Sequence, residues 1–114
     1  MKPIVALRGV TKVFQSGEST LTVLHDIDLD LAAGEIVAIS GSSGSGKSTL
    51  LNLVGGLDRP TAGSIVACDY AVHELDETDL TDYRARSVGF VFQFHYLLKD
   101  FTALENVMLP AYML

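Results

Sequence analysis

Hydrophobic and polar positions alternate over the first part of the chain. Residues 4–7 are apolar, and residues 22–31 set leucine, isoleucine and valine against threonine and acidic residues. Such a pattern is typical of strands with one buried and one solvated face. The polar stretch 15–19 contains a glycine and predicts a turn between them, and residues 33–34 predict another. We therefore expect a small antiparallel sheet over residues 1–34.

Longer apolar runs follow, and these do not alternate. Residues 35–40 predict an apolar strand, and residues 88–92 predict a buried strand. A third strand is expected over residues 64–68, after a loop over residues 58–63 that contains proline and glycine.

Three segments have helical character. The first covers residues 48–54, and two glycines at 55–56 are expected to end it. A second helix is expected over about residues 79–86, with Asp76 or Thr78 as its cap.

A capping box predicts the start of the third helix. Thr102 and Glu105 have the spacing at which each side chain bonds the other's backbone N–H, so we expect a helix from about Ala103. Pro110 should kink or end it. Glu105 could also be proposed as a general base, but the cap explains it fully.

Composition excludes several classes of protein. With 114 residues the chain is at most one domain, and its net charge of −6 argues against nucleic acid or anionic lipid as a partner. No segment has the roughly 18 to 20 apolar residues that span a bilayer. The single Cys68 and the absence of a signal-peptide pattern favour the cytoplasm.

The apolar content is high for so small a domain. The chain is 48% hydrophobic, with a mean hydropathy of +0.32, and its last residues carry no charge and no polar tail. We therefore expect apolar faces that meet something outside these residues, and we expect the chain to be truncated.

The most informative motif is a phosphate loop. Residues 41–48 fill the pattern G-x-x-x-x-G-K-[ST], between an apolar run and a helical segment. A flexible glycine-serine linker would lack the strand, the lysine and the helix. We predict that the loop binds a nucleoside triphosphate through Gly41, Ser42, Ser43, Gly44, Ser45, Gly46, Lys47, Ser48 and Thr49.

Each residue type in the loop suits this chemistry. The glycines let backbone N–H groups wrap the phosphates, and the following helix adds its positive N-terminal end. Lys47 should reach the β- and γ-phosphates, and the hydroxyl of Ser48 is placed to ligate Mg²⁺. Thr49 can donate toward the α-phosphate.

Beyond the loop, the order of features resembles the ATP-binding subunits of ABC transporters. Residues 23–39, VLHDIDLDLAAGEIVAI, resemble the segment that leads into the family's phosphate loop, and residues 90–93, FVFQ, resemble its glutamine loop. Residues 94–107, followed by Pro110, resemble the branch of lipoprotein-releasing, macrolide-exporter and cell-division ATPases, the lipoprotein-releasing type above all.

This resemblance implies an α/β P-loop NTPase fold of ABC type that is incomplete. Its single domain would comprise mainly antiparallel β structure (1–34), the segment from phosphate loop to glutamine loop as part of a parallel-sheet core (35–93), and the start of a helical subdomain (94–114). It also implies that Phe14 stacks on adenine and that Gln93 contacts Mg²⁺ and senses the γ-phosphate. Judged from the residues alone, an isolated phenylalanine more often belongs to the hydrophobic core, and an isolated glutamine more often lies on the surface.

The resemblance further implies ATP and Mg²⁺ as cofactors, transmembrane permease subunits and a second ATP-binding subunit as partners, and a place on the cytoplasmic face of the inner membrane. The region from about Gln93 to Asn106 would contact the permease. The 114 residues contain no Leu-Ser-Gly-Gly-Gln signature, no matching Asp-Glu pair and no switch histidine, so they should bind ATP without turnover.

Other interpretations stay open at this point. The chain could be a non-catalytic nucleotide-binding remnant, or a small P-loop kinase or GTPase in which Asp69 supports Mg²⁺, although a hairpin turn explains Asp69 more simply. Cys68 is expected to be a small buried strand residue. The histidines at 25, 73 and 95 are too scattered for a metal site. We expect surface roles for His25 and His73, and the resemblance places His95 on the partner surface.

Overall fold

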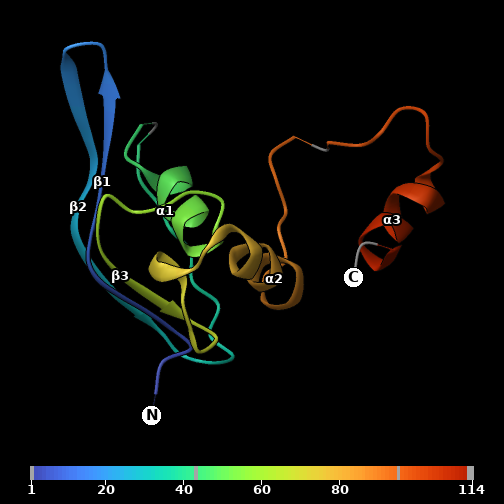
Figure 1. Cartoon of the computed structure of the whole chain (residues 1–114), viewed down its shortest axis with the longest axis horizontal. Helices are drawn as coiled ribbons and strands as arrows, with labels where there is room; N and C mark the ends of the chain where they lie inside the picture. The colour runs from blue at the N-terminus through green and yellow to red at the C-terminus, as the bar shows by residue number, and fades with distance from the viewer. Residues whose placement is uncertain (1, 43, 95, 113–114) are drawn as a thin grey trace.

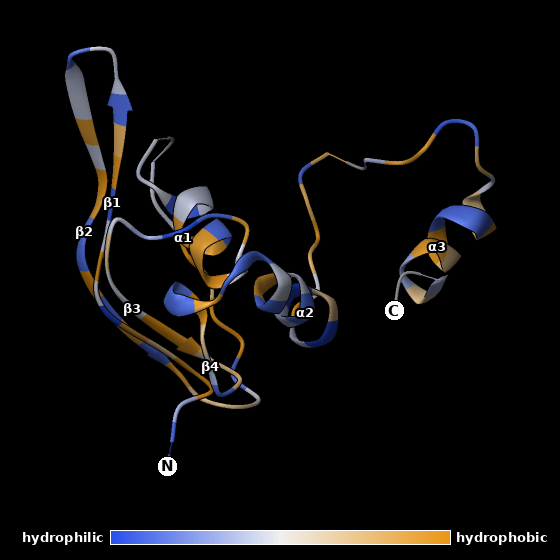
Figure 2. Cartoon of the chain, in the orientation of Figure 1, coloured by the Kyte–Doolittle hydropathy of each residue, from blue (hydrophilic) through white to orange (hydrophobic). Residues whose placement is uncertain are grey.

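The computed structural model describes residues 2–42, 44–94 and 96–112. The elements in chain order are β1 (Val5–Ser16), β2 (Ser19–Leu31), α1 (Lys47–Val54), β3 (Ala62–Ala67), β4 (Tyr70–Ala71), a short 3-10 helix η1 (Val72–Glu74), α2 (Glu77–Ser87) and α3 (Ala103–Tyr112). The strands form one sheet with the order β2-β1-β3-β4 (Figures 1 and 2).

The predicted antiparallel sheet is confirmed, with longer strands than the pattern indicated. β1 pairs with β2 from Val5 opposite Leu31 to Ser16 opposite Ser19, and it also pairs antiparallel with β3. The predicted turn is reduced to two residues, of which Gly17 has a φ of +62°. The resulting hairpin projects beyond the rest of the sheet (Figure 1).

One hydrophobic core joins the sheet to α1 and α2. Its buried residues are Leu7, Val10, Leu24, Leu50, Leu53, Ile65, Ala67, Val72, Leu80 and Tyr83. Figure 2 shows hydrophobic stretches on α1 and on the strands of the sheet. Burial of this apolar surface provides the main stabilisation of the fold.

The predicted first helix is confirmed, and α2 closes its C-terminal end. The hydroxyl of Tyr83 donates to the carbonyl oxygen of Val54 over 2.7 Å, and the Arg84 guanidinium donates to that of Gly56, also over 2.7 Å. Burial raises the pKa of Tyr83 to about 12, so this hydroxyl remains a donor. A cation is favourable at this end of a helix, where carbonyl groups lack intrahelical partners.

The second predicted helix is confirmed, two residues longer at its start than expected. Of the two possible caps, the structure has Asp76, whose carboxylate accepts the backbone N–H of Asp79 over 2.8 Å. Acidic residues lie in its first turn and basic residues in its last, which complements the helix dipole.

The expectation of an apolar strand over residues 35–40 and of a buried strand over residues 88–92 is wrong for the described structure. Neither segment is a strand, and Ile36 and Val91 are 99% and 101% exposed. A strand requires hydrogen-bonding partners along its edge, and among the described residues neither segment joins the sheet. High apolar content alone therefore does not produce a strand here.

The expected strand over residues 64–68 is β3, but it ends one residue earlier. Cys68 and Asp69 have φ angles of +51° and +68° and form the two-residue turn between β3 and β4. Positive φ at both central residues is the type I′ geometry of tight hairpins. The hairpin at Asp69 is confirmed, whereas Cys68 is a half-buried turn residue rather than a buried strand residue.

The capping box of α3 is confirmed, but the helix does not end at Pro110, one of the two effects expected of that proline. Thr102 N–H donates to the Glu105 carboxylate over 2.9 Å, and Glu105 N–H donates to the Thr102 hydroxyl over 3.1 Å. The helix continues past Pro110 to Tyr112. The proline lies in the last turn, where its missing N–H removes only one bond of the helical ladder.

Candidate functional site

The N-terminus of α1 is the centre of the candidate site. Gly46, at its cap position, has a left-handed backbone with a φ of +95°, and no hydrogen bond from a side chain caps this end within the described residues. The first N–H groups of a helix have no intrahelical acceptor, so they are free to bind an anion. Ser43 belongs to the predicted loop but lies outside the described residues.

Glycine is required where the loop meets the sheet. A Cβ atom on Gly46 would lie 2.9 Å from a methyl group of Leu24 and 3.1 Å from the carbonyl oxygen of Val23. The requirement is weaker at Gly41, where a Cβ atom would lie 2.6 Å from the Ser45 hydroxyl oxygen, which can rotate away. Only a residue without a side chain lets the start of α1 lie this close to β2.

Lys47 folds back over the loop that precedes it. Its ammonium group donates to the carbonyl oxygens of Gly41 and Ser42, the second over 3.0 Å. A cation and the positive end of α1 therefore lie on the same side of the loop. This donor-rich arrangement fits the phosphates of a nucleotide, which offer only acceptors at close range.

The two predicted magnesium ligands line one cavity. Ser48, in the first turn of α1, and the exposed Gln93 both border an open hollow of about 560 Å³. Among the described residues, no group of three or more histidine, cysteine or acidic side chains could hold a metal ion by itself. Two neutral oxygen ligands fit Mg²⁺ only when phosphates supply the negative charge, as they do for a magnesium-nucleotide complex.

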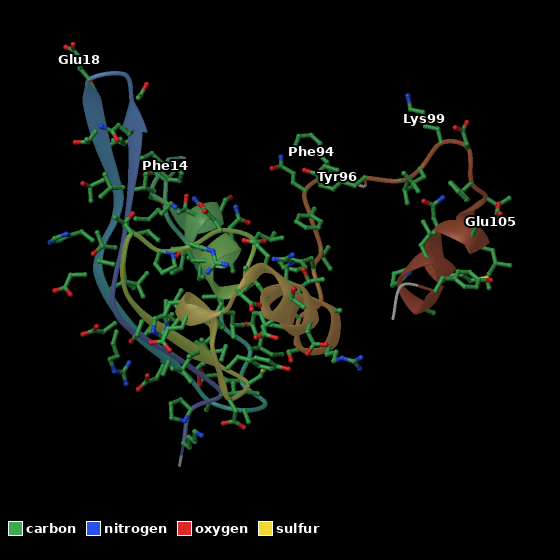
Figure 3. The ribbon with its side chains drawn as sticks, in the orientation of Figure 1. Phe14, Glu18, Phe94, Tyr96, Lys99 and Glu105 are labelled. Atoms are coloured by element: carbon green, nitrogen blue, oxygen red, sulfur yellow. The ribbon has the colours of Figure 1, made fainter. Side chains whose placement is uncertain are left out.

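Phe14 lies on β1, in the projecting hairpin, on the flank nearer to α1 (Figure 3). Its side chain is 41% exposed, and the ammonium of Lys12 lies 5.1 Å from the ring centroid. Phe14 is paired with Leu21, three residues from the Leu24 that contacts the start of α1. At 3.4 Å per residue, the ring lies about 10 Å along the hairpin from the phosphate loop.

Asp69 is placed away from this site. It forms a 2.7 Å ion pair with Lys2 in the β3–β4 turn, and a hydrogen bond from Lys2 lowers the pKa of its carboxyl. It borders a separate hollow and does not line the cavity that contains Ser48 and Gln93. The geometry therefore gives no support to a kinase or GTPase that uses Asp69.

The histidines have different surroundings. His25 is exposed on β2, as expected, and His95 lies outside the described residues. The surface role expected for His73 is wrong: its Nδ1 accepts the backbone N–H of Ile65 over 3.1 Å, and its side chain is mostly buried. This bond joins η1 to β3, a long-range contact that the local sequence does not indicate.

Sequence reasoning also missed Lys12. Its side chain is only 14% exposed and connects Phe14 to the segment after α1. A signal was available, because residues two apart on a strand lie on the same face and Lys12 precedes Phe14 by two positions.

An uncapped, glycine-lined helix start with a lysine folded over it is the form of a P-loop, the phosphate-binding element of nucleotide-binding α/β domains. The model of the ABC transporter family matches residues 24–113. This chain therefore belongs to the ABC transporter family.

Curated relatives place the chain near one branch of this family. It is 54% identical over 110 residues to the lipoprotein-releasing system ATP-binding protein LolD of Treponema denticola, covering 96% of this chain and 49% of the relative. It is 52% identical over 102 residues to LolD of Chromohalobacter salexigens, a match that covers 90% of this chain and 43% of the relative. The chain spans about half the length of these curated relatives, and its resemblance to the lipoprotein-releasing ATPases is confirmed.

Solved structures agree with the fold class. The chain resembles the ATP-binding cassette MJ0796, solved as a dimer in a post-hydrolysis state bound to ADP and Pi, with a TM-score of 0.91 and 44% identity. The match covers 96% of this chain and 47% of that chain. Within the described residues, no helix is both long and apolar enough to cross a membrane.

Proposed function

We propose that this protein binds MgATP and works with a membrane permease to release lipoproteins from the inner membrane, on its cytoplasmic face. The observation that carries the nucleotide part is the uncapped start of α1, with Lys47 held over its loop and Phe14 on the adjoining hairpin. The relatives named as lipoprotein-releasing ATP-binding proteins support the transport part.

Each site residue has a proposed role in holding the nucleotide. The amides of residues 41–49 bind the phosphate oxygens, and Lys47 neutralises the β- and γ-phosphates. Ser48 and Gln93, which line one cavity, would hold Mg²⁺ together with those phosphates. Thr49 donates toward the α-phosphate, and Phe14 stacks on the base. Bound ATP supplies the phosphoryl group whose transfer to water releases energy.

The 114 residues by themselves are proposed to bind MgATP without turnover. They contain no Leu-Ser-Gly-Gly-Gln signature, no Asp-Glu pair of the required kind and no switch histidine, the groups that close over ATP and activate water in the family. In this interpretation residues 1–34, 35–93 and 94–114 are parts of one incomplete nucleotide-binding domain. A catalytic assembly would need a second ATP-binding subunit, as in the dimeric cassette it resembles.

Residues 93–106 are proposed as the surface that contacts the permease. Support comes from their exposure, because Phe94, Leu97 and Leu98 are large apolar side chains that no core covers. Apolar surface of this kind is typical of protein interaction sites.

The test compares Lys47→Ala with Lys2→Ala, a second lysine that lies away from the loop. Titration calorimetry with MgATP should show binding by the parent protein and a loss of at least about 30-fold in affinity for Lys47→Ala, the cost expected when one member of a close charge pair is removed. Lys2→Ala should bind as the parent does, and phosphate release should be absent in all three. Equal affinity in the parent and Lys47→Ala would overturn the proposal.

A further inference from the structure

Lys12 is a charged residue in a largely buried position beside the proposed base-binding ring. Its ammonium donates to the carbonyl oxygen of Arg59 over 2.7 Å and forms an ion pair with Asp58 over 3.2 Å. It also lies over the ring of Phe14, 5.1 Å from the centroid. Two of the three N–H donors of the ammonium are therefore taken by these oxygens, and its charge also acts on the aromatic ring.

The two acceptors of Lys12 belong to a segment that is itself fixed. Residues 57–58 donate backbone N–H groups to the carbonyl oxygen of Asn52 in α1, over 2.8 and 3.3 Å. Thr61 makes two hydrogen bonds with β1. Its backbone N–H donates to the carbonyl oxygen of Thr11, and its hydroxyl accepts the backbone N–H of Val13. Lys12 is therefore held from α1 on one side and acts on Phe14 on the other.

This arrangement has a consequence for the ring. A cation attracts the negative face of an aromatic ring within about 6 Å, so one face of Phe14 is held by Lys12. The side chain remains 41% exposed, which leaves surface for a second stacking partner. A base that stacks on a ring already held in place loses less conformational entropy than one that must first order it.

We propose that Lys12 is a positioning residue for the nucleotide base: it fixes the orientation of Phe14 and links the base-binding ring to the segment that follows α1. This inference rests on the proposed function, in which Phe14 receives the base. Lys12 itself contacts neither the base nor the phosphates.

The alternative is a purely structural ion pair that ties β1 to residues 58–59. A structural role would affect every ligand of the site equally, because it would act through the stability of the fold. A positioning role would affect only ligands that carry a base. Tripolyphosphate has the phosphates of ATP and no base, so the two ligands separate these roles.

The experiment measures the affinity of the purified protein for MgATP and for magnesium tripolyphosphate by calorimetry. Lys12→Met keeps most of the apolar stem and removes the charge. We expect it to weaken MgATP binding by about 3- to 10-fold, the cost of ordering one freed side chain, with tripolyphosphate affinity unchanged. In a Phe14→Leu background the same substitution should change MgATP affinity by less than about twofold, since the ring it positions is gone.

Two further variants keep the test decisive. Lys12→Arg retains a cation that stacks on aromatic rings and should restore MgATP affinity to within about twofold. Lys2→Met is the same chemical change at an exposed ion pair with Asp69 and should alter neither affinity. If Lys12→Met does not fold, Lys12→Gln replaces it, because an amide can still donate to Arg59 without carrying charge.

Three outcomes would overturn the inference: unchanged MgATP affinity in Lys12→Met, an equal loss for tripolyphosphate, or the same loss in the Phe14→Leu background. Failure of the proposed function looks different, because the parent protein would then bind neither ligand. The two results are therefore separable in one set of titrations.

Discussion

Residues 2–87 and residues 88–112 both carry many large apolar side chains, yet only the first region has a core. Every buried residue of the described structure lies between Leu7 and Tyr83, and none of the described residues from 88 to 112 is buried. From Val88, which packs partly buried against this core, the second region leads away from the sheet and ends in α3, which stands apart (Figure 1). An apolar side chain is buried only where the chain supplies an opposing surface.

The two regions also differ in how their helices are stabilised. In the first region α1 is packed into the core, Tyr83 of α2 bonds the carbonyl group of its last residue, Val54, and Arg84 bonds the carbonyl group of Gly56, two residues beyond the helix. In the second region, α3 has no buried residue among those described and depends on its own capping box. It is also held by Asn106, whose side-chain amide accepts a hydrogen bond from the backbone N–H of Leu98 and donates one to the carbonyl oxygen of Leu98. Tertiary packing contributes most of a helix's stability, so α3 should be the weaker helix.

The largest effect should come from removing a core side chain. Leu53 is fully buried in α1, and Leu53→Ala should lower the free energy of unfolding by about 2–5 kcal/mol, from lost burial and the cavity left behind. Leu104→Ala is the same change on exposed α3 and should cost less than about 0.5 kcal/mol. Urea denaturation followed by circular dichroism measures both. Similar losses in the two variants would contradict the contrast between the regions.

A smaller effect is expected from a matched pair of glycines. A Cβ on Gly63 would lie 2.4 Å from the backbone oxygen of Gly9, and its φ of +91° disfavours any side chain. Gly63→Ala should therefore cost about 1–3 kcal/mol and lower the midpoint of thermal unfolding by several degrees. At Gly89, in the second region, no described atom lies within 4 Å of such a Cβ. Gly89→Ala should leave the midpoint nearly unchanged, and a large loss there would show hidden packing.

The smallest effect concerns the pH dependence of α3. Hydrogen bonds from the backbone and side chain of Thr102 lower the pKa of Glu105 below its ordinary value of 4.5. A depressed pKa stabilises the helix above that value, and the contribution disappears as the pH falls through the folded-state pKa. Nuclear magnetic resonance titration of the Glu105 carboxyl measures the shift directly.

Thr102→Val removes the hydroxyl and should move that pKa back toward 4.5, whereas Glu105→Gln keeps an acceptor for the cap and should make the helix content independent of pH in this range. A Glu105 that titrates at its ordinary value in the parent protein would show that the cap does not form in solution.

Much of the fold could be predicted because its signals are local. The capping residues Asp76, Thr102 and Glu105, the glycines after α1 and the turn at Asp69 each act within a few residues, and all were confirmed. The phosphate loop was predicted for the same reason, since its glycines, lysine and helix are contiguous. The predicted roles of its residues in nucleotide binding remain predictions.

The errors share a different cause. Residues 35–40 and 88–92 have the composition of buried strands, but strand formation depends on partners elsewhere in the chain. The contacts of His73 with Ile65 and of Lys12 with Arg59 join residues far apart along the sequence. No local pattern specifies these long-range contacts, so the sequence indicated a surface role for His73 and gave no sign that Lys12 reaches Arg59, although its place beside Phe14 on one strand face could have been predicted.

The contact between α1 and the hairpin has a consequence for the size of ligand that the proposed site can take. The start of α1 lies against Leu24, and the segment after α1 holds Lys12, which is paired with that same Leu24 across the hairpin. Both ends of α1 are thus attached to the hairpin. The strands of the hairpin therefore set the distance between the ring of Phe14 and the phosphate loop. A molecule whose base and phosphates are joined by a linker too short to span this distance could engage one subsite or the other, but not both.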